Sequence, residues 1–193
     1  MYELTAEPIL ANYSRSFVGV ELYEIIGRSM LSMAIRNDGK DDLAQQLNRA
    51  YGLALPEVGR WLSSEPENTQ LLRLQGDLCF VLFDYSGDRA LEKFAPRISD
   101  ACLSDQSDSW VMLSLSGEKS REVLERICPI DLHPTAFPPG SVTRTVMEHI
   151  GAMIVCEAED QYTLMALRSY AASFLHALEV SIKNVSGNKE GQG

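Results

Sequence analysis

The order of apolar and polar positions along the chain predicts short strands that alternate with short helices. Strict alternation or brief apolar runs indicate strands over 17–26, 29–36, 59–62, 71–74, 78–83, 110–115, 141–147, 151–157 and 161–167. Apolar residues spaced three and four apart indicate helices over 41–51, 87–101, 118–127 and 168–183. We expect the strands 17–26 and 29–36 to pair across Gly27.

This order of elements predicts an α+β fold. Its antiparallel sheets should contain split β-α-β (ferredoxin-like) elements rather than form a doubly wound parallel sheet. The first hundred residues have a similar alternation of strands and helices to the second half, although no sequence repeat is visible. Residues 1–183 are expected to form one compact domain, with two packed halves of about 1–104 and 109–183 as the alternative, because the run 105–109 has linker composition. Residues 184–193 are expected to form a flexible tail.

The segment 128–140 contains four of the eight prolines. Proline fixes φ and lacks a backbone donor, so this segment can be neither the interior of a helix nor a central strand. We predict a stiff, extended connection, which loses little entropy when it is ordered against a partner. Its candidate interface residues are Asp131, Leu132, His133, Phe137 and Pro138.

Charge and composition exclude several classes of partner. The net charge of −10 argues against a nucleic-acid or anionic-membrane binder. The start of the chain lacks the basic and apolar regions of a secretory signal, and no apolar run is long enough for a membrane span. We therefore expect a cytoplasmic protein. In that reducing compartment the widely spaced cysteines should be free thiols rather than a disulfide framework or zinc site; they are Cys79, Cys102, Cys128 and Cys156.

Motifs for catalysis and cofactor binding are nearly absent from the sequence. There is no Gly-x-Gly-x-x-Gly, Walker loop, Gly-x-Ser-x-Gly or His-Glu-x-x-His pattern, so we expect no catalytic, cofactor-binding or metal-binding residue in this chain. Asp131 and His133 could form a carboxylate–imidazole pair for general base catalysis. The favoured structural alternative is that Asp131 accepts backbone N–H bonds while His133 fixes the loop or contacts a neighbouring subunit.

Two further features concern the last helix and the remaining histidines. Arg168 opens the final helix, and either an interface role or an ion pair to the acidic loop containing Asp160 would explain a cation there. His149 is expected to be exposed in a hairpin turn. His176 is expected to be an ordinary helix-face residue rather than a metal ligand.

The second half of the chain resembles the gamma subunit of heterotetrameric sarcosine oxidase, over residues of about 110 to 178. The resemblance depends on an ordered set of short motifs, each beside a predicted strand or helix: Leu115-Ser116-Gly117, Cys128-Pro129-Ile130-Asp131-Leu132-His133-Pro134, Phe137-Pro138-Pro139-Gly140 and Arg168-Ser169-Tyr170-Ala171. Because these gamma subunits look like reduced aminomethyltransferases (glycine-cleavage T-proteins), the resemblance implies a reduced version of that folate-binding fold.

The resemblance also implies a function. In these complexes the alpha (large) subunit carries the NAD site and a folate-binding half, the beta subunit carries FAD, flavins including FMN lie on or between these two, and the delta subunit binds zinc. The gamma subunit holds no cofactor. The implied role is a non-catalytic subunit that packs against the alpha subunit while the complex converts sarcosine to glycine, hydrogen peroxide and 5,10-methylenetetrahydrofolate. Deprived of its partners, such a subunit is expected to self-associate through an apolar patch that includes Leu132, His133, Phe137 and Pro138.

Two alternatives remain open from the sequence. One is a gamma-type subunit of a related N-methyl amino-acid enzyme such as N-methylglutamate dehydrogenase, because the substrate would bind on another subunit. The other is a free-standing folate-binding protein similar to an aminomethyltransferase. That protein would need an Arg-x-x-Leu-Arg-x-Glu-type segment, from which the nearest candidate here, residues 72–77, departs.

Overall fold

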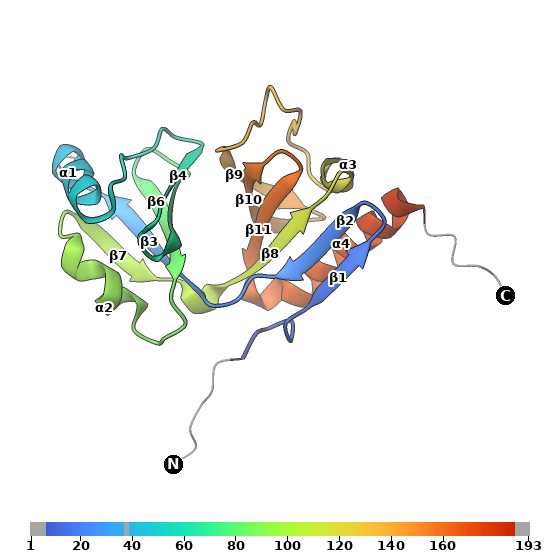
Figure 1. Ribbon diagram of the computed structural model, residues 1–193, viewed down its shortest axis with the longest axis horizontal. Helices are drawn as coiled ribbons and strands as arrows, with labels where there is room; N and C mark the ends of the chain where they lie inside the picture. The colour runs from blue at the N-terminus through green and yellow to red at the C-terminus, as the bar shows by residue number, and fades with distance from the viewer. Residues whose placement is uncertain (1–6, 37–38, 188–193) are drawn as a thin grey trace, which may run out of the picture.

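The computed structural model describes residues 7–36 and 39–187, which form two antiparallel sheets flanked by helices (Figure 1). The six-stranded sheet has the order β1-β2-β8-β11-β10-β9, and the five-stranded sheet has the order β4-β5-β6-β3-β7. The strands are β1 (Ser14–Phe17), β2 (Val20–Glu24), β3 (Arg28–Ile35), β4 (Arg60–Ser64), β5 (Thr69–Arg73), β6 (Leu78–Asp84), β7 (Ala101–Asp105), β8 (Trp110–Ser116), β9 (Val142–Met147), β10 (Ile150–Ala158) and β11 (Gln161–Leu167). The helices are α1 (Lys40–Tyr51), α2 (Ala90–Phe94), α3 (Ser120–Glu125) and α4 (Ala171–Ser186), with short 3-10 turns η1 (Pro66–Asn68), η2 (Ala95–Arg97), η3 (Ser107–Ser109) and η4 (Arg168–Tyr170).

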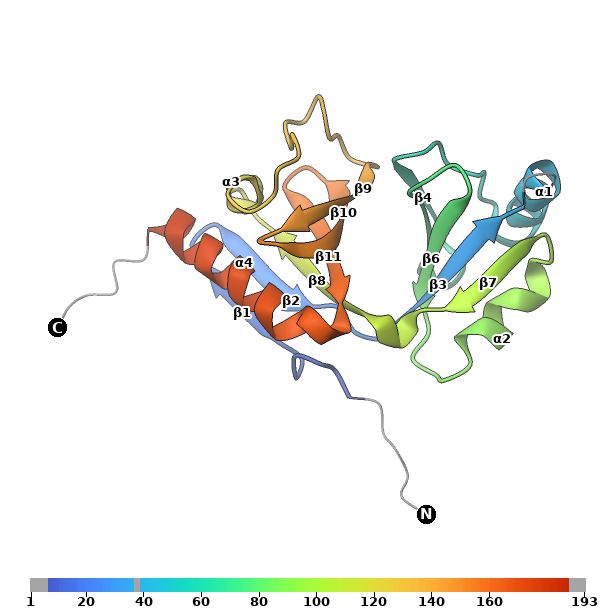
Figure 2. The same cartoon turned by 180° about the vertical axis from the view of Figure 1, so that it is seen from behind.

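The helices cover the outer faces of the two sheets, and the inner faces meet (Figure 2). Helices α1 and α2 pack on the five-stranded sheet, while α3 and α4 pack on the six-stranded sheet. A third cluster of buried side chains lies between the sheets and is rich in methionine: Met30, Met112, Met153 and Met165. Soft, unbranched methionine side chains fill irregular gaps of this kind well.

Burial on both faces explains the apolar runs that marked the strands. In β10, Ile154 and Cys156 point to the helix side, whereas Met153 and Val155 point to the space between the sheets. Successive side chains of a strand lie on opposite faces, so a strand in the middle layers must be apolar at nearly every position. The sequence therefore shows continuous apolar runs here instead of clean alternation.

The two sheets share one topology. The series β3, α1, β4, β5, β6, α2, β7 gives the order β4-β5-β6-β3-β7, and the series β8, α3, β9, β10, β11, α4 gives the matching order β9-β10-β11-β8. In the six-stranded sheet, β2 from the start of the chain occupies the place that β7 has in the five-stranded sheet. The predicted α+β fold with antiparallel sheets and split β-α-β elements is confirmed.

The predicted pairing of 17–26 with 29–36 is wrong. Residues 14–24 form the hairpin β1–β2, which turns at Gly19 (φ 79°), and β2 pairs with β8 in the six-stranded sheet. Strand β3 pairs with β6 and β7 in the other sheet. An apolar pattern identifies a strand but does not specify its partner.

The predicted helix over 87–101 is also wrong in its second half. Helix α2 ends at Phe94, a 3-10 turn containing Pro96 follows, and Ala101 begins strand β7. Proline cannot continue a helix interior, which accounts for the early end. By contrast, the helix predicted over 41–51 is confirmed, and Gly52 ends it in the left-handed conformation (φ 66°).

The domain assignment stays a prediction. Within the expected tail, residues 184–186 belong to helix α4, and residues 188–193 lie outside the described part of the chain. Over the ranges that the structure describes, no helix is both long and apolar enough to cross a membrane.

Candidate functional site

The proline-rich segment 128–140 has neither helix nor strand, as predicted, and its end connects the two sheets. The backbone N–H of Gly140 donates to the carbonyl of Cys156 (2.9 Å), and the N–H of Trp61 donates to the carbonyl of Gly140 (3.0 Å). The guanidinium of Arg60 donates to Ser141 Oγ (2.8 Å) and to the carbonyl of Pro139 (3.2 Å). The segment is therefore fixed against both β10 and β4.

The predicted interface residues of this segment divide into two groups. Leu132 and Phe137 are only 1% and 9% exposed and belong to the core under α3 and α4. Asp131 and His133 are exposed, and Pro138 is half-buried. The two apolar side chains thus anchor the segment to its own protein, and the two polar ones face solvent. The interface role of this set stays a prediction.

Asp131 and His133 do not form the general-base pair considered from the sequence. Asp131 Oδ1 accepts the backbone N–H of His133 (2.9 Å), while His133 Nδ1 lies 2.8 Å from Thr135 Oγ1. The alternative, in which Asp131 accepts a backbone N–H, is confirmed. Each side chain therefore satisfies a local polar group of a segment that lacks regular backbone pairing.

Arg168 lies in η4, the turn that leads into α4. Its guanidinium donates to the carbonyl of Glu7 (3.3 Å). The ion pair proposed with Asp160 is wrong, because that carboxylate pairs with Arg121 (3.0 Å). Arg168 thus connects the first described residues to the start of the last helix. Its interface role stays a prediction.

A polar network between the sheets was not found by sequence reasoning. Arg28 Nη1 donates to Gln70 Oε1 (2.8 Å), Gln70 Nε2 donates to Glu157 Oε2 (3.0 Å), and Thr163 Oγ1 donates to Glu157 Oε1 (2.8 Å). Arg28 also forms an ion pair with Asp84 (3.3 Å). The network joins β3, β5 and β6 of one sheet to β10 and β11 of the other. Each member is an ordinary strand residue in the sequence, so no local signal marked it.

Burial has the largest effect on the pKa of Glu157 in this network. Burial raises the pKa of Glu157, and the bond from Thr163 and the charge of Arg28 counteract part of that rise. Both oxygens of the Glu157 carboxylate are hydrogen-bonded, one by Thr163 and one by Gln70. This arrangement is suited to holding two sheets in register.

The cysteines are free thiols, as predicted. Burial raises the pKa of Cys79 to about 12, and it also raises the pKa of Cys156. Both thiols therefore stay protonated at neutral pH and are poor nucleophiles. In the described ranges, no group of three or more His, Cys, Asp or Glu side chains is placed to hold a metal ion.

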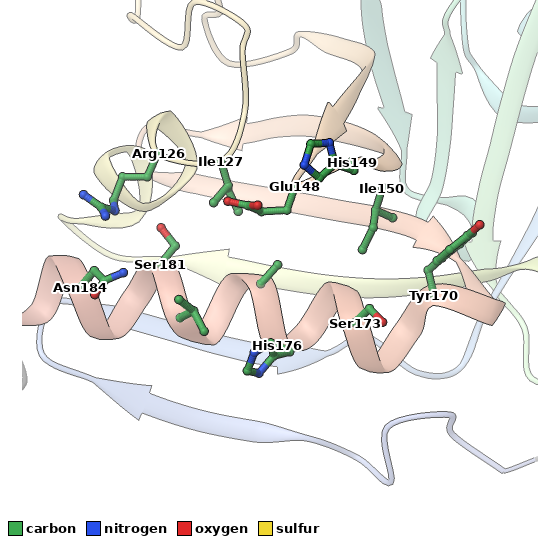
Figure 3. Close-up of a pocket in the computed structure, with 12 residues that line it drawn as sticks. Arg126, Ile127, Glu148, His149, Ile150, Tyr170, Ser173, His176, Ser181 and Asn184 are labelled. Carbon is green, nitrogen blue, oxygen red and sulfur yellow. The ribbon is translucent and has the colours of Figure 1, made fainter.

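A surface groove of about 540 Å³ lies between α4, the end of α3 and the β9–β10 turn (Figure 3). Its lining residues come from all three elements: Arg126, Ile127, Glu148, His149, Ile150, Tyr170, Ser173, His176, Ala177, Val180, Ser181 and Asn184. His149 is exposed, as predicted, and the exposed His176 lies in the same groove. No local sequence pattern indicated that these two histidines share a site, because they are far apart along the chain.

Comparisons with known proteins agree with this architecture. The "Sarcosine oxidase, gamma subunit family" matches residues 36–183. Sarcosine oxidase subunit gamma of Corynebacterium sp. (strain P-1) is 26% identical over 133 residues, which cover 68% of this chain and 66% of that protein. The match therefore spans just under two thirds of that relative.

Two solved structures share the fold. A chain of the heterotetrameric sarcosine oxidase from Corynebacterium sp. U-96 aligns with a TM-score of 0.76 and 21% identity, covering 89% of this chain and 88% of that one. Aminomethyltransferase T of the Bartonella henselae glycine cleavage system aligns with a TM-score of 0.61 and 15% identity, covering 83% of this chain and 45% of that one. The expected likeness to a reduced aminomethyltransferase fold is confirmed. The family match spans most of both sheets, and the chain belongs to the sarcosine oxidase gamma subunit family.

Proposed function

We propose that this protein is the gamma subunit of a cytoplasmic heterotetrameric sarcosine oxidase and has no active site of its own. The observation that carries the proposal is the family match over residues 36–183. This range includes eight of the eleven described strands, β4 to β11. The fold shared with a chain of the Corynebacterium sp. U-96 complex supports it.

The proposed complex converts sarcosine, oxygen and tetrahydrofolate to glycine, hydrogen peroxide and 5,10-methylenetetrahydrofolate. FAD, FMN, NAD, tetrahydrofolate and zinc would be held by the alpha, beta and delta subunits, and the alpha subunit would be the direct partner. This chain would contribute a rigid body, because the network around Glu157 and the contacts of Arg60 hold its two sheets together.

The state of its reactive side chains is consistent with a non-catalytic role. Buried Cys79 and Cys156 hold their protons. Asp131 accepts a backbone N–H, and the carboxylate of Glu157 is engaged at both oxygens. These groups stabilise local structure, so substrate chemistry would take place on another subunit.

Co-expression of a tagged copy with candidate alpha, beta and delta subunits tests the proposal. The expected result is a yellow complex that oxidises sarcosine, whereas the chain alone is colourless and inactive. Preferential turnover of N-methylglutamate would instead identify the complex as the related N-methylglutamate dehydrogenase. A chain that purifies alone and binds tetrahydrofolate would contradict the subunit assignment.

A further inference from the structure

The groove in Figure 3 runs along one side of α4. Its helix residues follow a spacing of three and four, from Ser173 through Ala177 and Ser181 to Asn184, so they form one continuous stripe. From Tyr170 to Asn184 this stripe is about 21 Å long at the helical rise of about 1.5 Å per residue. An open groove of that length fits an elongated segment better than a compact small molecule.

The floor of the groove is apolar and its centre is accessible. Ile150 is buried and Ile127 is half-buried, whereas Val180 and Tyr170 are 43% and 50% exposed. Small side chains at Ser173 and Ala177 allow another backbone to approach the helix closely. These features suit an apolar side chain that an incoming segment would place between α4 and the β9–β10 turn.

The charges around the groove differ from those of the whole chain. The protein carries 27 acidic and 17 basic side chains. The groove is instead lined by one arginine, Arg126, and one acid, Glu148, together with two histidines, His149 and His176, so it lacks the acidic excess of the whole chain. Among the hydrogen bonds and ion pairs of the described residues, none involves these four side chains. They are therefore available to a partner.

We infer that this groove binds an acidic segment of another subunit. An aliphatic or aromatic side chain of that segment packs on Ile127, Ile150 and Val180, and its carboxylates face Arg126 and the two histidines. Complementary charge gives such an interface its orientation and speeds association. Arginine and tyrosine, both present on this rim, are enriched among residues that dominate binding energy. The inference rests on the proposed function in one respect, because it takes the partner to be a subunit of the same complex.

Two substitutions test the groove in the assembled complex. Ala177→Trp fills the groove, and Arg126→Glu reverses the charge at its rim. Each is expected to weaken binding of the partner subunits at least about tenfold, as for central interface residues. For Arg126→Glu, the deficit should shrink as salt is raised. Matched controls are Ala172→Trp at an exposed position of α4 that does not line the groove and Arg49→Glu at an exposed position of α1. Both should bind like the wild type.

Thermal unfolding of the free variants separates a folding defect from a binding defect. A photo-crosslinking amino acid at Val180 provides a second readout that does not depend on these substitutions. Its product, identified by mass spectrometry, should be a partner peptide that contains aspartate or glutamate near an apolar residue. Capture of a second copy of this chain, or of a peptide without acidic residues, would overturn the inference.

The outcomes also separate the groove from the proposed function. If the wild-type chain assembles and both groove variants assemble equally well, the inference is wrong and the subunit assignment stands. If the wild-type chain does not assemble with sarcosine oxidase subunits, the proposed function has failed. The crosslinked peptide then shows whether the groove binds an acidic segment of a different protein. That outcome would contradict the inferred partner, a subunit of the same complex.

Discussion

The five-stranded and six-stranded units have the same order of strands and helices but differ in how the last position of the sheet is filled. In the five-stranded unit, β7 follows α2 directly along the chain. In the six-stranded unit the equivalent place is taken by β2, which comes from the start of the chain and brings β1 with it. The comparison shows that the same sheet topology can be completed by the next strand along the chain or by a distant one. The six-stranded unit therefore depends on residues that precede the five-stranded unit in the sequence.

The connection from the first helix to the edge strand also differs between the units. It spans residues 52–59 in the five-stranded unit and residues 126–141 in the six-stranded unit. The longer connection contains the proline-rich segment, and its ends lie beside the groove at Arg126 and beside β4 at Ser141. The six-stranded unit therefore differs from the five-stranded unit in this connection as well as in its added hairpin.

Removal of the hairpin 14–24 is expected to have the largest effect. It would take away the buried side chains of Val20 and Leu22 and uncover one edge of β8. A single buried leucine already contributes about 2–5 kcal/mol in truncation experiments. We expect loss of cooperative unfolding in the six-stranded unit, measured by circular dichroism and hydrogen exchange. Native-like protection of β8 and β11 in the truncated chain would contradict the dependence on the hairpin.

Substitution of Arg28 tests the connection between the units. Arg28→Ala would leave Glu157 without its nearby cation and Gln70 without a donor, and breaking such a partly buried network should cost about 1–3 kcal/mol of the free energy of unfolding. Chemical denaturation measures this loss. The control Arg89→Ala removes an exposed arginine from an exposed ion pair and should change stability by less than about 1 kcal/mol.

The pH dependence of stability sharpens the same test. Burial raises the pKa of Glu157 in the folded state above its ordinary value of 4.5. The folded state therefore binds this proton more tightly, so the group's stabilising contribution is complete below pH 4.5 and is lost as pH rises through the raised folded pKa. In Glu157→Gln, that part of the pH dependence should disappear. An unchanged profile of unfolding free energy against pH would show that Glu157 does not titrate in this way.

The smallest expected effect is a difference in stability loss between two glycine substitutions, one in each of the two connections. Gly140 has φ +85°, and an added Cβ would lie 3.0 Å from Arg60 Nη2, whereas Gly52 has φ +66° with nothing within 4 Å. Alanine at either position carries the left-handed penalty of about 1–2 kcal/mol. Gly140→Ala should also displace the Arg60 side chain, so thermal unfolding should show a larger loss for it than for Gly52→Ala. Equal losses would mean that Arg60 moves without cost.

Much of the local structure could be predicted from the sequence. The strand 161–167 and the helix 41–51 appear where expected because periodic burial and a terminal glycine are local signals. Strand β7 was missed because Ala101–Asp105 is a short, mostly exposed edge strand that carries little apolar pattern. The lack of helix and strand over 128–140 followed from its prolines, but the inward packing of Leu132 and Phe137 did not.

By itself, then, the sequence determined the types of element, the mixed α+β class and the family motifs between 110 and 178, because these depend on neighbouring residues. Tertiary structure alone decided that β2 completes the distant sheet, that Arg28, Gln70 and Glu157 meet between the sheets, and that His149 and His176 share one groove. Each of these depends on contacts between residues far apart in the chain. Such contacts are selected by the packing of whole layers, and a local pattern of apolar and polar residues does not specify which distant residues will meet.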